Sequence, residues 1–144
     1  MNITIAIDSF KGSLSSLEAG HAIEQGIKHV FPDASVTVRP LADGGEGTVE
    51  ALAFGMGGNI ETITVTGPLG DPVECRYGIL PETNTAILEM SGAAGITLVP
   101  AGMRNPLKTT TYGVGEVICD AIKKGCRRFI VGIGGSATND GGIG

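Results

Sequence analysis

Residues 129–144 read Phe129-Ile-Val-Gly-Ile-Gly-Gly-Ser-Ala-Thr-Asn-Asp-Gly-Gly-Ile-Gly144. The apolar start predicts a buried parallel strand, and the glycines predict a loop whose backbone N–H groups can approach an anion closely. Three interpretations stay open for this loop: a phosphate site that uses Ser136 and Thr138, a dinucleotide fingerprint over Gly132–Ala137, and a purely structural turn. The sequence contains no G-x-x-x-x-G-K-[ST] motif, so a Walker-type nucleotide site is not predicted.

The composition indicates a globular chain with many tight turns. Its 144 residues include 24 glycines, which cluster between apolar segments, and three cysteines, which we expect to be reduced. The net charge of −5 argues against a nucleic-acid or acidic-membrane partner, because either would need a basic surface. No apolar run reaches transmembrane length and no basic leader is present, so we expect a cytoplasmic protein. Gly141, Gly142 and Gly144 poorly suit the end of a domain, so we expect an N-terminal portion.

The first part of the chain predicts a strand, a helix, a second strand and a second helix. Residues 3–7 alternate as a strand and run into Asp8-Ser-Phe-Lys11. Ser15 and Glu18 have the spacing of a capping box, and helical periodicity then continues to Phe31-Pro32. Residues 36–38 predict the next strand, and residues 49–56 predict the next helix. This order is typical of parallel strands joined by helices, whose carboxyl ends bind ligands.

The pattern changes after Gly67. Residues 73–80 and 85–90 alternate on either side of a short turn, which predicts a hairpin. A helix is predicted from about residue 112 to Gly125, and the last strand follows over 129–133. Thr109-Thr-Thr111 could cap this helix or contact substrate, and we favour the cap. We therefore expect an α/β fold with a first domain over 1–66 and a second, mixed-sheet domain over 67–144, both incomplete.

Two further polar turns follow predicted strands. Asp8 and Lys11 could take a proton from a hydroxyl and hold phosphate oxygens, or could be a capping Asp and a solvated Lys. Asp43-Gly-Gly-Glu46-Gly places two carboxylates in a glycine-rich turn, which could hold Mg²⁺ or serve only the helix dipole. Phosphoryl transfer needs phosphate-binding amides, a Lys, a carboxylate-held metal and a base. The three turns together favour this chemistry.

Six segments resemble the successive motifs of the type I glycerate kinases, in the order of that family. They are Asp8-Ser-Phe-Lys-Gly-Ser-Leu-Ser15, Leu41-Ala-Asp-Gly-Gly-Glu-Gly-Thr48, Thr66-Gly-Pro-Leu-Gly70, Leu88-Glu-Met90, Thr110-Thr-Tyr-Gly-Val-Gly-Glu116 and Gly132-Ile-Gly-Gly-Ser-Ala-Thr-Asn-Asp-Gly-Gly142. The resemblance implies ATP-dependent phosphorylation of D-glycerate, usually to 2-phosphoglycerate. It also implies one flavodoxin-like and one mixed α/β domain with the active site between them, in proteins much longer than this chain.

Together with this resemblance, the residues of the polar turns lead to hypotheses about their roles. Lys11 would bind the transferring phosphate, and Asp43 with Glu46 would hold Mg²⁺ or orient the glycerate hydroxyl. The base is left open between Asp8, Asp43 and Asp140. The phosphates and metal of ATP would be cradled by Gly134, Gly135, Ser136, Thr138, Asn139 and Asp140.

Two other functions stay open. One is an oxidoreductase that binds a dinucleotide at Gly132–Ala137, and the other is an inactive anion-binding fragment of the kinase. The expected partners are D-glycerate and ATP, with no nucleic acid and no membrane, and a homo-oligomer is left open.

Overall fold

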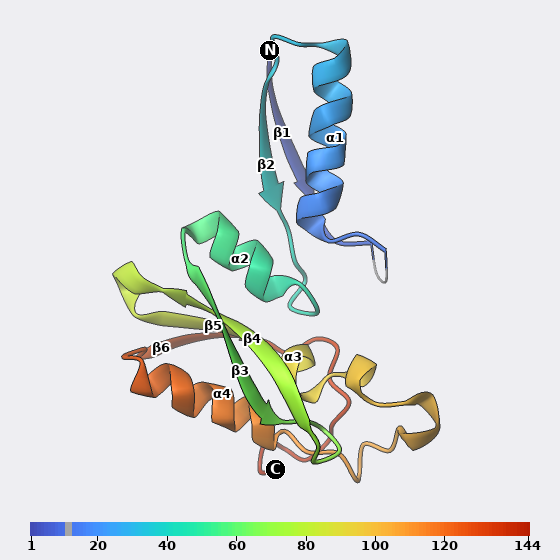
Figure 1. The fold of residues 1–144 in the computed structure, drawn as a ribbon, viewed down its shortest axis with the longest axis vertical. Helices are drawn as coiled ribbons and strands as arrows, with labels where there is room; N and C mark the ends of the chain where they lie inside the picture. The colour runs from blue at the N-terminus through green and yellow to red at the C-terminus, as the bar shows by residue number, and fades with distance from the viewer. Residues whose placement is uncertain (11–12) are drawn as a thin grey trace.

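The structure is a computed structural model that describes residues 1–10 and 13–144. Its first unit consists of β1 (Asn2–Ile7), α1 (Ser16–Val30) and β2 (Ser35–Pro40), with β1 and β2 paired in parallel (Figure 1). The predicted capping box is confirmed: the N–H of Glu18 donates to Ser15 Oγ at 3.2 Å, and the N–H of Ser15 donates to the Glu18 carboxylate at 2.8 Å. Gly20 allows α1 to lie directly on Val38 of β2, because a Cβ there would clash with the Val38 side chain.

The second unit is a four-stranded sheet in the order β3-β4-β5-β6. The first two pairings are antiparallel and the last, between β5 and β6, is parallel. The predicted hairpin is confirmed as β4 and β5. The bounds of these elements are β3 Asn59–Thr66, β4 Pro72–Leu80, β5 Thr85–Glu89 and β6 Arg128–Gly132, with α2 (Thr48–Met56), α3 (Met90–Ala94) and α4 (Tyr112–Lys123) as the helices and short 3₁₀ turns at Pro81–Thr83, Ile96–Leu98 and Ala101–Met103.

The strand pairing differs from the expected division at residues 66 and 67. β3 belongs to the first predicted domain, yet it pairs with β4 from Asn59↔Ile79 to Thr66↔Pro72. The turn between them is a hairpin loop, in which the N–H of Gly67 donates to the carbonyl oxygen of Asp71 at 2.8 Å. The sequence predicted a turn here correctly, but the turn connects two strands of one sheet and does not separate two domains. The segment between β2 and α2 leads instead from the first sheet to the second unit (Figure 1).

The core lies on both faces of the four-stranded sheet. Val114, Val117 and Ala121 of α4 pack with Tyr77 on one side, and Val49 of α2 packs with Leu80 and Ile87 on the other. Every residue of β5 is buried, as expected for a central strand covered on both faces. This packing fixes the carboxyl ends of β5 and β6 at one edge of the sheet, where the glycine-rich loop begins.

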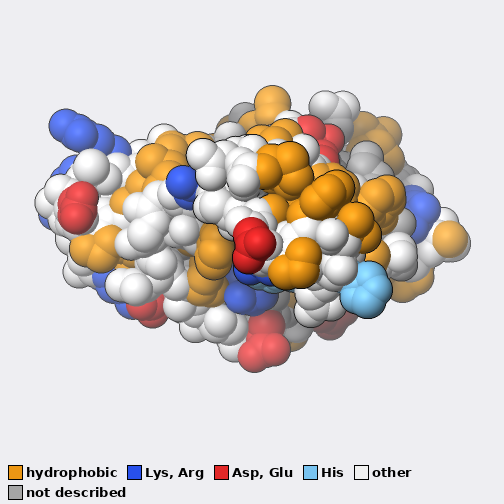
Figure 2. Space-filling model, turned by 90° about the horizontal axis from the view of Figure 1, so that it is seen from above, with side chains coloured by type: hydrophobic (Ala, Val, Ile, Leu, Met, Phe, Trp, Pro, Cys, Tyr) orange, Lys and Arg blue, Asp and Glu red, His pale blue; other side chains and the backbone are white. Residues whose placement is uncertain are grey.

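Hydrophobic side chains gather on the face shown in Figure 2, at the end of the molecule opposite the C-terminus. Exposed apolar residues of the first unit include Met1, Val30 and Phe31. Within residues 1–10 and 13–144, no helix has both the length and the apolar character needed to cross a membrane.

Candidate functional site

The glycine-rich loop begins where β5 and β6 end side by side. In the parallel pairing Glu89 is the register partner of Gly132. Beyond β6 the loop is held by the end of α3 and the residues after it: the N–H of Ile96 donates to the carbonyl oxygen of Gly135, and the N–H of Ala137 donates to that of Ala94, both at 2.8 Å. Strand ends and backbone hydrogen bonds therefore position the first half of the loop.

The Asp43–Gly47 turn lies directly against this loop. The N–H of Gly134 donates to the carbonyl oxygen of Gly44 at 2.8 Å. A Cβ on Gly132 would lie 2.6 Å from that same oxygen, and a Cβ on Gly134 would lie 2.8 Å from Gly45 Cα. Only residues without a side chain allow the two backbones to approach this closely. Two of the three turns predicted to meet are therefore in contact.

Asp43 and Glu46 both have exposed side chains on this turn. One Asp43 carboxylate oxygen accepts the N–H of Gly45 at 2.9 Å, which fixes the carboxylate across its own turn. Asp8 is also exposed, and its carboxylate accepts the N–H of Ser9 at 2.7 Å. The N–H of Leu41 donates to the Ile7 carbonyl at 2.9 Å, so Asp8 lies beside the start of the Asp43 turn. Lys11 lies outside the described residues.

Asp140 fastens the end of the loop to α4. Its carboxylate accepts the N–H of Thr111 at 2.7 Å, the Thr111 hydroxyl at 2.9 and 3.0 Å, and the N–H of Gly142 at 2.9 Å. Burial opposes ionisation, but these hydrogen bonds outweigh it and lower the pKa of Asp140. Of the three threonines expected to cap α4, Thr111 occupies the N-cap position but makes no capping hydrogen bond, and its hydroxyl donates to Asp140 instead. The Thr110 hydroxyl accepts the N–H of Tyr112, the first residue of α4, at 3.1 Å.

An open hollow of about 430 Å³ lies over this loop and the first turn of α4. Ser136, Thr138, Asn139 and Asp140 line it, and the hydroxyls of Ser136 and Thr138 are 2.8 Å apart. Its described lining residues include no Lys or Arg, so an anion here would be held by N–H groups and hydroxyls. Asp8, Asp43 and Glu46 do not line this hollow, although the Asp43 turn borders the loop that forms it.

Two expectations for bound groups can be compared with this geometry. Across residues 1–10 and 13–144, no three His, Cys, Asp or Glu side chains form a cluster that could hold a metal ion. The dinucleotide fingerprint requires a helix to open directly after its glycines. Residues 133–144 instead form turns and one isolated bridge, Gly95↔Ser136. Within residues 133–144, no helix opens directly after these glycines.

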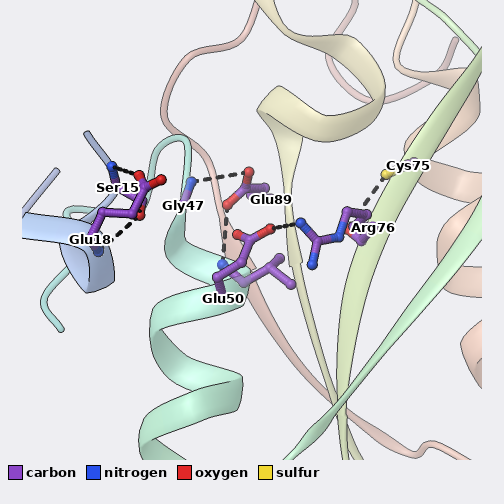
Figure 3. A network of polar contacts seen from close by, with 8 residues as sticks. Ser15, Glu18, Gly47, Glu50, Cys75, Arg76 and Glu89 are labelled. Carbon is purple, nitrogen blue, oxygen red and sulfur yellow. Dashed lines mark hydrogen bonds and ion pairs between the residues drawn. The ribbon is translucent and has the colours of Figure 1, made fainter. Parts of the chain in front are cut away.

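Glu89 is a site residue to which sequence reasoning gave no role. It ends β5 and is only 9% exposed, and its two carboxylate oxygens accept the N–H groups of Gly47 at 3.3 Å and Val49 at 3.2 Å (Figure 3). Burial raises the pKa of Glu89, with the two N–H donors opposing the rise. The sequence did contain a signal for this residue: an acidic side chain directly follows the apolar run Ala86-Ile-Leu88. A charged group at the end of a buried strand needs specific hydrogen-bond partners, which indicates a structural or functional role.

Fold and site define an α/β protein whose glycine-rich turns converge at the carboxyl ends of its strands. The chain belongs to the glycerate kinase family, whose model matches residues 3–144. It is 56% identical over all 144 residues to a glycerate kinase of Bacillus subtilis (strain 168) and 51% identical to the glycerate 2-kinase of Escherichia coli (strain K12). The resemblance stated from the sequence is thereby confirmed.

A solved structure shares the fold. The crystal structure described as glycerate kinase 2 from Salmonella typhimurium LT2 is 52% identical, with a TM-score of 0.85 over the whole of this chain. The chain spans 38% of the length of that protein and of the two relatives above.

Proposed function

We propose that this chain supplies part of the active site of an enzyme that transfers the γ-phosphoryl group of ATP to the 2-hydroxyl of D-glycerate, giving 2-phosphoglycerate. The observation that carries the proposal is the direct contact between the Asp43–Gly47 turn and the loop at Gly132–Gly134. This contact brings exposed carboxylates to the edge of a loop rich in N–H groups. Phosphoryl transfer needs this combination, since positioning and charge stabilisation supply most of the catalysis.

The proposal gives this chain's residues roles in nucleotide binding, phosphate binding and proton transfer. In this proposal Gly134, Gly135, Ser136, Thr138 and Asn139 bind the nucleotide through N–H groups and hydroxyls, and Lys11 binds the transferring phosphate. Asp43 orients the glycerate hydroxyl and accepts its proton as the new O–P bond forms and the bond to ADP breaks. Its exposure and its fixed carboxylate favour Asp43 over Asp140, whose oxygens already accept donors from Thr111 and Gly142.

Mg²⁺ fits this site as an ion that arrives with the nucleotide. Mg²⁺ is usually held by one or two carboxylates together with phosphate oxygens, and Glu46 offers one exposed carboxylate beside Asp43. Bound there, the ion would neutralise charge on the phosphate oxygens. We assign Asp140 to fastening the loop instead of binding metal, because its lone pairs are largely engaged. We also propose a cytoplasmic location.

An ADP-release assay tests the proposal. The protein to use is a fusion of residues 1–144 with the part of the Bacillus subtilis relative that lies beyond the matched region, called the fusion enzyme below, with the 144-residue chain measured beside it. The fusion enzyme should release ADP from ATP only when D-glycerate is present. Failure to do so, with tight NADH binding in its place, would favour an oxidoreductase. Activity of the fusion enzyme alone, without turnover by the shorter chain, would identify the latter as a binding fragment.

A further inference from the structure

Glu89 closes a junction between three segments that are distant in sequence. Its backbone is paired with Gly132, the last residue of β6, where the glycine-rich loop begins, and Gly132 lies against the carbonyl of Gly44. Its side chain reaches in the other direction, to the N–H groups of Gly47 and Val49 at the start of α2. One residue therefore contacts the loop through its backbone and the Asp43–Gly47 turn through its carboxylate.

The start of α2 depends on this carboxylate. A helix usually satisfies its first N–H groups with a Ser, Thr, Asp or Asn at the N-cap. Here the N-cap is Gly47, with φ 90° and no side chain to make the bond. Glu89, at the end of β5, accepts these N–H groups in place of a capping side chain. Its negative charge also interacts favourably with the positive end of the helix dipole. Without the Glu89 carboxylate, the N–H groups of Gly47 and Val49 would lose the side-chain acceptor that they have in the structure.

Glu89 is buried, so its hydrogen bonds to Gly47 and Val49 differ from solvent-exposed contacts at the surface. The side chain is 9% exposed, and Arg76, the cationic side chain labelled in Figure 3, is paired with Glu50 at 2.7 Å. A buried carboxylate is costly unless its oxygens are hydrogen-bonded. A glycine turn on its own is mobile, because its residues restrict the backbone least. The carboxylate and the turn thus stabilise each other.

We propose that Glu89 is a positioning residue that holds the Asp43–Gly47 turn at a fixed distance from the glycine-rich loop, so that Asp43 meets the hydroxyl to be phosphorylated. This inference rests on the proposed function. The turn is fastened at two points: Gly44 to Gly134 through the backbone, and Gly47 with Val49 to Glu89. Glu89 acts through the turn and does not itself contact the substrate.

Kinetics of Glu89→Gln in the fusion enzyme test this role. The variant keeps the side-chain length but replaces one acceptor oxygen by an NH₂ group, which cannot accept from an N–H. We expect kcat to fall about 10- to 100-fold, the range that a displacement of about 1 Å causes, while KM for ATP changes less than about twofold. Glu50→Gln is the matched control, since it removes a neighbouring carboxylate on the same helix that is bound to Arg76. It should leave kcat unchanged.

A double variant separates positioning from simple stabilisation. If Glu89 acts through Asp43, then Asp43→Asn with Glu89→Gln should lose little more activity than Asp43→Asn alone. Independent, multiplying losses would overturn the proposal, and so would a normal kcat per folded molecule in Glu89→Gln. If the unmodified fusion enzyme is inactive, the result counts against the proposed function. If the unmodified fusion enzyme and its Glu89→Gln variant are equally active, the result counts against the positioning role alone.

Amide hydrogen exchange of the unmodified fusion enzyme tests the contact of Glu89 with Gly47 and Val49 without any substitution. The backbone amides of Gly47 and Val49 should exchange slowly, because both are bonded to a buried carboxylate. Exchange at the rate of free peptide amides in the segment 45–50 would overturn the proposal even if Glu89→Gln failed to fold.

Discussion

The backbone N–H of Gly134 donates a hydrogen bond to the carbonyl oxygen of Gly44 at 2.8 Å, which joins the last loop of the chain to the turn that follows β2. Gly44 follows β2 of the first sheet and Gly134 follows β6 of the second. This bond and the neighbouring contact of Gly132 therefore define how the two units meet at the site. The catalytic proposal depends on this geometry, because it sets the distance between the carboxylates and the loop.

Gly132→Ala should separate the two turns. The added Cβ would lie 2.6 Å from the Gly44 carbonyl oxygen, which is backbone and cannot move aside like a side chain. We expect the free energy of unfolding to fall by about 1–3 kcal/mol and the fusion enzyme to lose most of its kcat. Gly26→Ala on α1 is the control: a Cβ there meets nothing within 4 Å, and the helix should gain up to about 1 kcal/mol. Urea unfolding and the ADP-release assay measure both effects. Equal activity in the two variants would show that the close approach is unimportant.

Thr111→Val should loosen the end of the glycine-rich loop. The change keeps the shape of the side chain but removes the hydroxyl that donates to the Asp140 carboxylate at 2.9 and 3.0 Å. We expect a loss of about 1–3 kcal/mol in the free energy of unfolding, the size of a hydrogen bond to a charged group, and weaker ATP binding by calorimetry. Thr64→Val, at an exposed position of β3, should change neither quantity. Unaltered ATP affinity in Thr111→Val would contradict a role for this contact in the nucleotide site.

Glu89 should make stability depend on pH. Burial raises the pKa of Glu89 above its ordinary 4.5, the N–H groups of Val49 and Gly47 oppose the rise, and the Glu50 carboxylate adds to it. The nearby Cys75 thiol is neutral, since burial and Glu89 raise its pKa to about 11, and Arg76 is paired with Glu50. A folded pKa above the unfolded one means that the stabilisation is complete below about pH 4.5 and is lost as the pH rises through the folded pKa.

The measurement is urea unfolding of the 144-residue chain and of its Glu89→Gln variant between about pH 4 and pH 8. The free energy of unfolding of the unmodified chain, minus that of the variant, should fall as the pH rises. A difference that grew with pH would mean that the N–H donors outweigh burial and that the pKa of Glu89 is lowered.

The far side of the sheet should affect stability without affecting catalysis. Tyr77 is fully buried and its hydroxyl donates to the Asp120 carboxylate at 2.6 Å, while burial and this acceptor raise its pKa to about 12. Tyr77→Phe should lower the free energy of unfolding by about 1–2 kcal/mol, with kcat of the fusion enzyme unchanged. A loss of kcat per folded molecule would show that α4 transmits its packing to the site.

The sequence predicted the elements better than the contacts between them. Strand alternation predicted the β4–β5 hairpin, and the capping box placed the start of α1 correctly, because both signals are local. The Gly67 turn was interpreted as a division between domains because a hairpin loop and a linker share the same glycines and prolines. Glu89 was given no role because its partners, Gly47 and Val49, depend on how α2 packs on the sheet. The expectation that the Asp43 turn would meet the glycine-rich loop, made because both are polar, glycine-rich turns that follow strands, is confirmed by the contact between them.

The most direct test of the account is ³¹P NMR of the product that the fusion enzyme makes from ATP and D-glycerate, with and without Asp43→Asn. A phosphate on the 2-hydroxyl has one proton on the adjoining carbon and gives a doublet, whereas one on the 3-hydroxyl has two and gives a triplet. We predict a doublet for the unmodified fusion enzyme and almost no signal for Asp43→Asn. A triplet, no phosphoglycerate at all, or equal product from both proteins would contradict the account.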